Sequence, residues 1–507
     1  MNNGKICISI CAETADELIE QIKCAEDLAD VIEIRFDCIS ENQMSKAFAI
    51  LASRKILLLT NRPREQGGKV EIDRPGRIAF WNAFVNNGLL DKRKVWIDCE
   101  FDLKSEISNF QFQKIVSFHD FAGVPDNLEK IYEIIAVKSD IIKIAAQTND
   151  ITDTIPIWKL LQKAKSENQQ IIPIAMGESG KWTRILGLAH GAFMTYAALD
   201  AGRETAPGQV SVKDLIEVYR VKELDETTEI YGILGNNTSV SMSPYMHNAA
   251  FKYHNLNSVF VPLQTHDLDE FMCRMVKPET REIELNFAGF SVTIPHKQKI
   301  IKHLDFIDQT AKKIGAVNTI RIVDGKFHGY NTDAQGFIEP LLNSYGDLSG
   351  AKVAIVGAGG AARACVYALK NEGAEVTIFA RDLVKAQDLA EEFEVELREL
   401  PKTKDQKPKT NFSNFDILVN TTPLGMKGKF DGETPATAEQ LKGLHLVYDL
   451  VYIPFQTPLM NEADIAEVPK IGGLAMLIAQ AMQQQKIWTG KDAPMKEMSR
   501  AVLERLS

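Results

Sequence analysis

Eight short apolar runs follow one another between the start of the chain and about residue 220, and this repetition constrains the fold more than any other feature. Amphipathic sequence such as Asp16–Ala29 or Leu128–Val137 separates them. Eight strand-and-helix units predict an α/β fold, a parallel (β/α)₈ or TIM barrel. A doubly wound sheet is the alternative, but so short a stretch favours a closed barrel. The runs are Ile6–Ile10, Val31–Phe36, Ile56–Leu59, Val95–Ile97, Lys114–Phe118, Ile141–Ala145, Ile171–Ala175 and Ala192–Ala197.

A lysine interrupts one of these runs, in Ile141-Ile142-Lys143-Ile144-Ala145. Burial depresses the pKa of an ammonium group, and a neutral amine attacks a ketone to form a Schiff base. His119 ends the preceding run, where an imidazole can move protons beside an iminium carbon. From these two residues alone, a lysine that reaches solvent and a hydrogen-bonded structural histidine remain the alternative.

Further polar motifs follow other runs: Glu33-Ile34-Arg35, Thr60-Asn61-Arg62, Met176–Arg184 and Thr205–Gln209. With them, residues 5–222 resemble type I 3-dehydroquinate dehydratase. The resemblance implies that Lys143 forms the imine and that His119 is the general acid and base. It implies that the ring hydroxyls are held by Glu33, Arg35 and Arg62, and the carboxylate by Arg184 with Thr205 and Gln209. Gln66 stands where the family often has glutamate, and Thr205 where serine is frequent.

A glycine-rich turn follows the apolar segment Ala351–Val356 and precedes a helix, in the sequence Gly357-Ala358-Gly359-Gly360-Ala361-Ala362. This order is typical of a dinucleotide-binding Rossmann unit. The next strand ends at Ala380-Arg381, where an NAD site usually has an acid. An arginine there suits a 2′-phosphate and predicts NADP, whereas an ordinary exposed arginine is the alternative.

The surrounding motifs make residues 230–500 resemble shikimate dehydrogenase. They include Ser241–Pro244, Ser291–Lys297, Ala316–Thr319, Gly329–Asp333, Asn420–Met426, Tyr448–Tyr452 and Gly473–Gln480. The resemblance implies a catalytic dyad of Lys297 and Asp333, for which a structural ion pair is the alternative. It implies substrate contacts from Ser241, Ser243, Thr293, Asn318, Tyr452 and Gln480. It implies cofactor contacts from Gly357, Ala358, Gly359, Gly360, Ala361, Arg381, Thr421 and Gly473.

These segments suggest five parts of the chain. Residues 1–222 form the barrel, and the polar stretch 223–229 is a linker. A substrate-binding domain follows at 230–345 and a Rossmann domain at 346–470, and helices at 471–507 return to the substrate-binding domain.

The composition narrows the cellular setting. A net charge of −10 argues against general nucleic-acid binding, and no run of about 18 apolar residues predicts a membrane helix. The seven cysteines form no C-x-x-C pair, and Cys7, Cys38 and Cys99 lie in apolar runs. These features, with a chain that begins directly in a strand, predict buried thiols without disulfides and a cytoplasmic location. We expect a monomer or a homodimer, although none of these features decides between them. No metal cluster is apparent.

Together the two resemblances predict a bifunctional lyase and oxidoreductase of the shikimate pathway of aromatic amino acid biosynthesis. 3-Dehydroquinate is dehydrated first, and 3-dehydroshikimate is then reduced with NADPH to shikimate. Three alternatives stay open: an NAD-dependent quinate/shikimate dehydrogenase, another Schiff-base lyase such as a class I aldolase, and a catalytically inactive binding or regulatory protein.

Overall fold

The computed structural model describes residues 2–49, 51, 53–85, 94–137, 139–400 and 412–506. The chain divides into two compact units, each described here by itself. Unit 1 comprises Met1–Ser241 and Asn257–Phe287, and unit 2 comprises Met242–Leu256 and Ala288–Ser507. Within these described ranges, no helix is long and apolar enough to cross a membrane.

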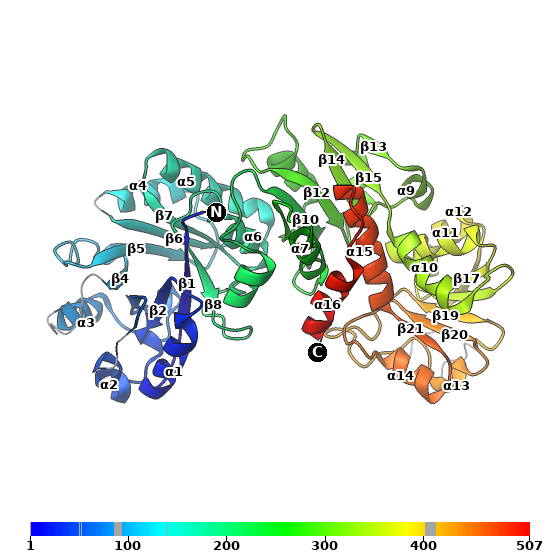
Figure 1. Cartoon of the computed structure of the whole chain (residues 1–507), viewed down its shortest axis with the longest axis horizontal. Helices are drawn as coiled ribbons and strands as arrows, with labels where there is room; N and C mark the ends of the chain where they lie inside the picture. The colour runs from blue at the N-terminus through cyan, green and yellow to red at the C-terminus, as the bar shows by residue number, and fades with distance from the viewer. Residues whose placement is uncertain are drawn as a thin grey trace. The chain divides into compact units, whose positions relative to one another are not determined.

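Eight parallel strands form the centre of unit 1 (Figure 1). Their order in the sheet is β7-β6-β5-β4-β3-β2-β1-β8, which is the cyclic order of a (β/α)₈ barrel. A backbone hydrogen bond of 2.8 Å from Phe193 N to Ile171 O joins the two ends of this order. The strands are β1 (Lys5–Ile10), β2 (Val31–Arg35), β3 (Ile56–Thr60), β4 (Val95–Glu100), β5 (Gln113–Asp120), β6 (Ile141–Gln147), β7 (Gln170–Met176) and β8 (Met194–Ala198).

Helices follow most of these strands, because the amphipathic segments between the runs bury one apolar face against the sheet. The helices are α1 (Ala15–Glu26), α2 (Met44–Ala49), α3 (Arg74–Val85), α4 (Leu128–Ala136), α5 (Ile155–Ser166) and α6 (Lys181–Leu186). Between β4 and β5 there is only a short 3₁₀ turn, Phe101–Leu103. Strand β8 is followed by the short strand β9 (Val210–Ser211) and a π-helical turn, Asp214–Val218.

The polar segment expected to be a linker is packed rather than free. Leu224 within it is 1% exposed, and Asn2 Nδ2 donates a 2.9 Å hydrogen bond to its carbonyl oxygen. The rest of unit 1 is the parallel pair β10 (Glu229–Gly235) and β11 (Ser258–Gln264), followed by α8 (Leu268–Phe271) and a π-helical turn at Met272–Val276.

Unit 2 begins with α7 (Ser243–Tyr253) and a small mixed sheet. Strands β12 (Phe287–Val292), β14 (Thr319–Val323) and β15 (Lys326–Tyr330) pair antiparallel, and β13 (Phe306–Ile307) joins β15 in parallel. Two helices belong to this part, α9 (Gln309–Ile314) and α10 (Asp333–Tyr345).

A six-stranded parallel sheet follows, with the order β18-β17-β16-β19-β20-β21. This is the 3-2-1-4-5-6 order of a Rossmann fold. Alternate residues of one strand enter different cores: Val353 and Ile355 belong to one and Ala354 and Val356 to another, so both faces are covered. The elements are β16 (Lys352–Val356), α11 (Gly360–Asn371), β17 (Glu375–Ala380), α12 (Leu383–Glu392), β18 (Glu396–Glu399), β19 (Ile417–Asn420), α13 (Ala438–Leu441), β20 (Leu446–Asp449), α14 (Pro458–Ile465) and β21 (Lys470–Gly472).

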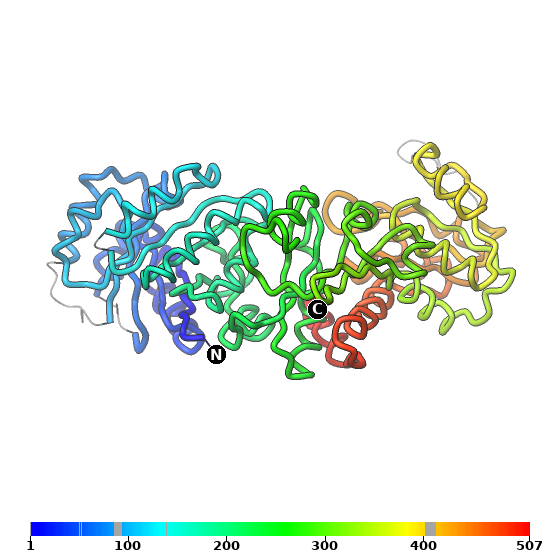
Figure 2. The backbone as a smooth tube through the Cα atoms, turned by 90° about the horizontal axis from the view of Figure 1, so that it is seen from above, coloured from blue at the N-terminus to red at the C-terminus, as the bar shows by residue number. Residues whose placement is uncertain are grey.

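Two C-terminal helices, α15 (Gly473–Thr489) and α16 (Met495–Leu506), complete unit 2 and appear in red in Figures 1 and 2. Helix α15 packs against α10. Its Trp488 donates a 2.9 Å hydrogen bond from Nε1 to Ile320 O of β14, so the chain end lies on the small sheet. In this position Gln484 accepts a hydrogen bond from Ser291 of β12 and donates one to Thr319 of β14, and Gln480 lies against Gly336 of α10.

Candidate active sites

One cavity of unit 1 contains all eight side chains that the sequence selected in the barrel. It lies where β2, β3, β5, β6 and β7 end or are followed by loops, which is the face on which barrel enzymes carry their chemistry. The lining includes Glu33, Arg35, Arg62, His119, Lys143, Arg184, Thr205 and Gln209.

Lys143 lines this cavity and is 5% exposed. Its Nζ lies 2.9 Å from Asp98 Oδ2, 4.0 Å from Glu33 Oε1, and 4.1 Å from the centre of the Tyr196 ring. The amine therefore has an anion on one side and an aromatic face on another, and it does not extend to solvent.

Arg184 is a buried cation with unused hydrogen-bonding capacity. Its Nη2 donates to Pro207 O at 3.1 Å, whereas Nε and Nη1 have no hydrogen-bond partner in the described part of the chain. Burial lowers the pKa of the guanidinium to about 10. A buried guanidinium with two free donors facing a cavity suits a bidentate carboxylate ligand.

His119 lies on β5 in the same cavity. Burial, aided by the charges of Arg62 and Lys143, holds the pKa of its imidazole well below the usual value of 6.5, so the ring is neutral near pH 7. Asp120 does not orient this histidine, since its Oδ1 accepts hydrogen bonds from Ala122 N and Gly123 N and caps the following loop.

The charged side chains at the ends of β2 and β3 are held by other groups of the barrel. Arg35 forms two hydrogen bonds to Asp37, of 2.8 and 2.7 Å, and Glu33 accepts hydrogen bonds from Ser9 and Thr60. Arg62 contacts Asp98 and Glu100, each at 2.8 Å. These partners fix the orientation of the three side chains before any ligand binds.

The loop after β8 supplies two more polar groups. Thr205 N donates to Gln209 Oε1 at 2.8 Å, and Gln209 Nε2 donates to Thr205 Oγ1 at 3.1 Å. Gln66 also lines the cavity, and its buried Oε1 has no hydrogen-bond partner among the residues described.

Sequence reasoning missed Asp98, Glu100 and Tyr196. Asp98 and Glu100 are two positions apart on β4, so both side chains point to the same face of the sheet. Two acids in a strand with no exposed residue are the same signal that singled out Lys143. Tyr196 carries no such signal, because a tyrosine in an apolar strand is ordinary core sequence.

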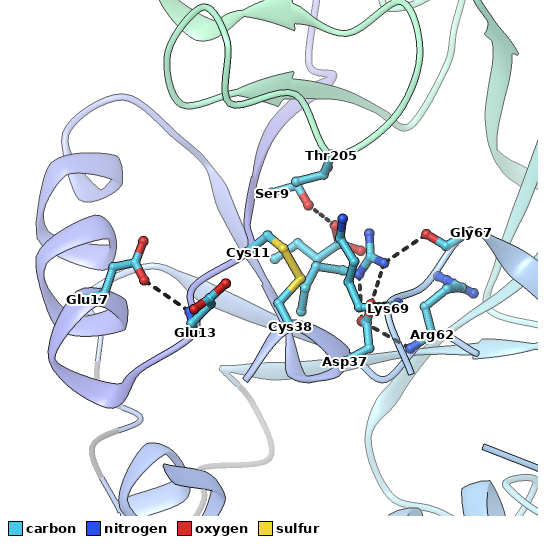
Figure 3. Close-up of a disulfide and its surroundings, with 12 residues drawn as sticks. Ser9, Cys11, Glu13, Glu17, Asp37, Cys38, Arg62, Gly67, Lys69 and Thr205 are labelled. Atoms are coloured by element: carbon cyan, nitrogen blue, oxygen red, sulfur yellow. Dashed lines mark hydrogen bonds and ion pairs between the residues drawn. A yellow bond between two sulfur atoms is a disulfide. The ribbon is translucent and has the colours of Figure 1, made fainter. Parts of the chain in front are cut away.

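The expectation of no disulfide was wrong. Cys11 and Cys38 form a disulfide with a Cα–Cα distance of 5.3 Å (Figure 3). The bond joins the residue after β1 to the residue that ends the 3₁₀ turn after β2. These strands are neighbours, paired at Ile10 and Ile34, so the barrel brings together two cysteines that no local motif connects. Cys7 and Cys99 are buried free thiols, as predicted.

In unit 2, Lys297 and Asp333 lie side by side at the end of the small sheet. Lys297 Nζ is 2.6 Å from Asp333 Oδ2, and Asn318 Nδ2 donates to Asp333 Oδ1 at 2.9 Å. Asp333 is 4% exposed and begins α10, and its N–H donates to Asn331 Oδ1. Both carboxylate oxygens are thus engaged, and the lysine points to one of them.

The other predicted residues of unit 2 lie on several elements. Ser243 begins α7 and is buried, and Thr293 follows β12 just before the cis peptide bond Ile294–Pro295. Gln480 on α15 lies against α10, where a Cβ on Gly336 would meet its Cβ at 2.7 Å. Tyr452 follows β20. Ser241 belongs to unit 1, so it is not placed relative to these residues.

The glycine-rich turn between β16 and α11 has the geometry that a dinucleotide needs. Gly357 has φ of +114°, and a Cβ there would lie 2.5 Å from Thr421 Oγ1. Gly359 is the N-cap of α11, and nothing lies within 4 Å of a Cβ built on it. The N-terminus of α11 has no side-chain cap and no acidic residue in its first turn. With open space in front of it, such a helix end suits the negative charge of a pyrophosphate. The residues therefore fit the predicted nucleotide.

The turn also meets the lysine, because a Cβ on Gly360 would lie 3.5 Å from Lys297 Cδ. β16 and β19 are neighbours at the point where the strand order reverses, so the turn after β16 and Thr421 after β19 flank the position where Rossmann folds bind nucleotides. Arg381 is exposed directly after β17.

The fold and the two sites define a two-enzyme fusion: a barrel with a buried lysine in its cavity, and a dinucleotide-binding reductase. Family models agree with this class. Residues 6–226 match type I 3-dehydroquinase, 233–320 the shikimate dehydrogenase substrate binding domain, 341–423 shikimate/quinate 5-dehydrogenase, and 473–503 the shikimate 5′-dehydrogenase C-terminal domain.

Known proteins resemble the whole chain and its second half. A chloroplastic bifunctional 3-dehydroquinate dehydratase/shikimate dehydrogenase of Arabidopsis thaliana is 34% identical over 522 residues, covering 97% of this chain and 83% of that protein. A shikimate dehydrogenase (NADP⁺) of Methanopyrus kandleri is 38% identical, covering 56% and 98%. A crystal structure of a shikimate dehydrogenase with NADP⁺ is 37% identical, with a TM-score of 0.50 and coverage of 56% and 98%.

The chain belongs to the family of bifunctional 3-dehydroquinate dehydratase/shikimate dehydrogenases. The predictions of the α/β fold class, of a lyase joined to an oxidoreductase, and of NADP as the cofactor are confirmed.

Proposed function

We propose that the eight cavity residues of unit 1 dehydrate 3-dehydroquinate and that the dyad of unit 2 reduces 3-dehydroshikimate to shikimate. The observation that carries the first assignment is one cavity that holds both a buried amine, Lys143, and a buried guanidinium with two free donors, Arg184. A substrate with a ketone and a carboxylate satisfies both groups.

In the dehydration, Lys143 attacks the substrate ketone and forms a protonated imine, which acidifies the neighbouring C–H bond. The neutral His119 removes that proton and then protonates the departing hydroxyl, so one residue acts as base and acid. Its lowered pKa supports this role, because a protonated ring cannot accept the proton.

Arg184 binds the carboxylate, with Thr205 and Gln209 completing that end of the cavity. Glu33, Arg35 and Arg62 contact the ring hydroxyls, and their fixed partners pre-orient them. Gln66 retains hydrogen-bonding atoms where the family often has an acid, so it contributes to the loop over the site without a charge.

In the reduction, bound NADPH supplies the hydride. Lys297 stabilises and protonates the oxygen on which negative charge develops, while Asp333 holds the lysine and contacts a ring hydroxyl. Asn318 keeps the second oxygen of Asp333 engaged. Ser241 and Ser243 bind the carboxylate, and Thr293, Tyr452 and Gln480 surround the ring.

The nucleotide contacts come from the turn Gly357–Ala361, with Thr421 and Gly473 beside it, and Arg381 contacts the 2′-phosphate. We further propose the domain boundaries given by the sequence, a monomer or homodimer, no nucleic-acid or membrane partner, and a cytoplasmic location.

The test is a coupled assay on the full chain and on two variants, Lys143→Ala and Lys297→Ala. Wild type should form the enone from 3-dehydroquinate and then oxidise NADPH. The first variant should lose enone formation but still reduce added 3-dehydroshikimate, and the second should show the reverse. The activity that each variant retains therefore shows that the loss of the other activity is not due to a failure of the whole chain to fold. A Lys143→Ala protein that still dehydrates the substrate contradicts the imine mechanism.

A further inference from the structure

Asp98 is the nearest anion to the amine that the proposed function makes the nucleophile. Its Oδ2 lies 2.9 Å from Lys143 Nζ, and Arg62 Nη2 lies 2.8 Å from the same oxygen. Asp98 is fully buried. A buried carboxylate is therefore directed at the reacting nitrogen.

We propose that Asp98 is a further catalytic residue of the dehydration, which holds the Lys143 amine for attack and is then the counter-ion of the protonated imine. The inference rests on the proposed function, because it assigns a role within the imine mechanism of Lys143.

The balance of the reaction explains why one carboxylate serves both states. The lysine ammonium and the ketone give a protonated imine and water: a C–N bond forms, the C–O bond breaks, and the carbonyl oxygen leaves as water with two of the three protons of the ammonium group. The nitrogen has one positive charge before and after, and it keeps one N–H. That N–H can donate to Asp98 throughout, so the buried charge is never left unpaired.

Other groups around Lys143 are less suited to this role. Glu33 Oε1 is 4.0 Å away, and the two oxygens of Glu33 accept hydrogen bonds from Thr60 and Ser9. Other titratable or charged groups that act on Lys143 or Asp98 are Tyr196, whose ring lies 4.1 Å from Nζ, and Cys7, His119 and Arg62.

The ionisation of Asp98 agrees with the geometry. Burial alone would raise the pKa of its carboxyl group, but the charges of Arg62 and Lys143 outweigh burial and hold the pKa far below the usual range. Asp98 is therefore an anion near pH 7, and in this proposal it pairs with the imine without acting as a proton acceptor.

Asp98→Asn tests the proposal, with Glu100→Gln as the matched control. Glu100 lies on the same face of β4 and also pairs with Arg62, but its second ion pair is to Arg77 rather than to Lys143. We measure kcat, KM and the pH profile of dehydration, and the amount of substrate adduct that borohydride traps on Lys143. Reduction of added 3-dehydroshikimate and circular dichroism report folding of the full chain.

For Asp98→Asn we expect kcat to fall about 100-fold, because a buried charge loses its partner, together with less trapped adduct. The alkaline limb of the pH profile, where the protonated imine loses its proton, should move to lower pH. Glu100→Gln should raise KM through Arg62 but leave the limb and the adduct unchanged. Substitution of a residue that only supports the fold would not shift the alkaline limb of the pH profile.

A kcat within threefold of wild type for Asp98→Asn, or a lower kcat with an unmoved limb and full trapping, overturns the proposal. If Asp98→Asn does not fold, Asp98→Glu carries the test: it keeps the charge but displaces it, so the limb should stay while kcat falls at least about tenfold. Wild-type kcat in that variant refutes the role. Absence of any adduct on wild-type Lys143 would instead remove the imine mechanism, and this role with it.

Discussion

The disulfide between Cys11 and Cys38 gives a quantitative prediction about the stability of unit 1. The cross-link spans a sequence separation of 27 residues, which include all of α1 and β2. Cross-linking two such positions restricts the unfolded chain, and a loop of this length corresponds to about 3.5 kcal/mol of stability. With a urea m-value of about 3 kcal/mol/M, reduction should lower the unfolding midpoint of unit 1 by about 1.2 M.

Tryptophan fluorescence can follow this unfolding selectively. Four of the five tryptophans, Trp81, Trp96, Trp158 and Trp182, belong to unit 1, and Trp488 belongs to unit 2. The comparison is wild type with and without dithiothreitol, the double variant Cys11→Ser/Cys38→Ser, and Cys24→Ser as a control at an exposed free thiol. Dithiothreitol should lower the midpoint of wild type and of Cys24→Ser, and leave the double variant unchanged.

Thiol titration of the denatured, unreduced protein supplies the independent check. Five thiols should react, since the chain has seven cysteines and five of them are free. A count of seven, or a wild-type midpoint that dithiothreitol does not shift, would refute the disulfide and the stability derived from it.

Two further predictions concern unit 2. His247 is fully buried, and burial lowers the pKa of its imidazole from 6.5 to about 3. Between these values the unfolded chain binds a proton that the folded chain excludes. The free energy of unfolding should therefore fall by about 1.4 kcal/mol for each unit of pH below 6.5. Asp449, whose pKa burial raises from 3.8 to about 6, has the opposite slope between those values. Thermal inactivation of the reductase is measured against pH for wild type and for His247→Gln. Asp449 is present in both proteins, so the difference between their pH slopes reports the contribution of His247 alone. Equal slopes would contradict this account. Arg381→Gln should raise KM for NADPH about tenfold or more, through the loss of a charged hydrogen bond to the 2′-phosphate, and leave KM for NADH unchanged; a parallel rise for both nucleotides would argue against that contact.

Much of the architecture could be predicted because its signals are local. Each barrel strand is a short apolar run, and each is found in the structure close to its expected bounds. The glycine-rich turn was equally clear, since a positive φ at Gly357 and an open helix N-terminus are properties of a few consecutive residues. Lys143 stood out because a charge inside an apolar strand requires a reason.

The missed features depend on distance in space rather than in sequence. Cys11 and Cys38 pair only because β1 and β2 are neighbours, and Leu224 in an otherwise polar stretch is buried only because the stretch packs on unit 1. Asp98 has a local signal, since it is a charge inside a buried strand, but only the fold shows that it pairs with Lys143.

The sequence by itself determined which residues form strands, which turn accepts a nucleotide, and which side chains carry charge into the apolar strands. These follow from side-chain period and backbone preference, which act over a few residues. Only the tertiary structure decided the partners of those charges: Lys143 with Asp98, Arg184 with two unused donors, and Asp333 between Lys297 and Asn318. Pairing, burial and pKa depend on groups that lie tens of residues apart in the chain, and folding brings them within a few ångströms of each other.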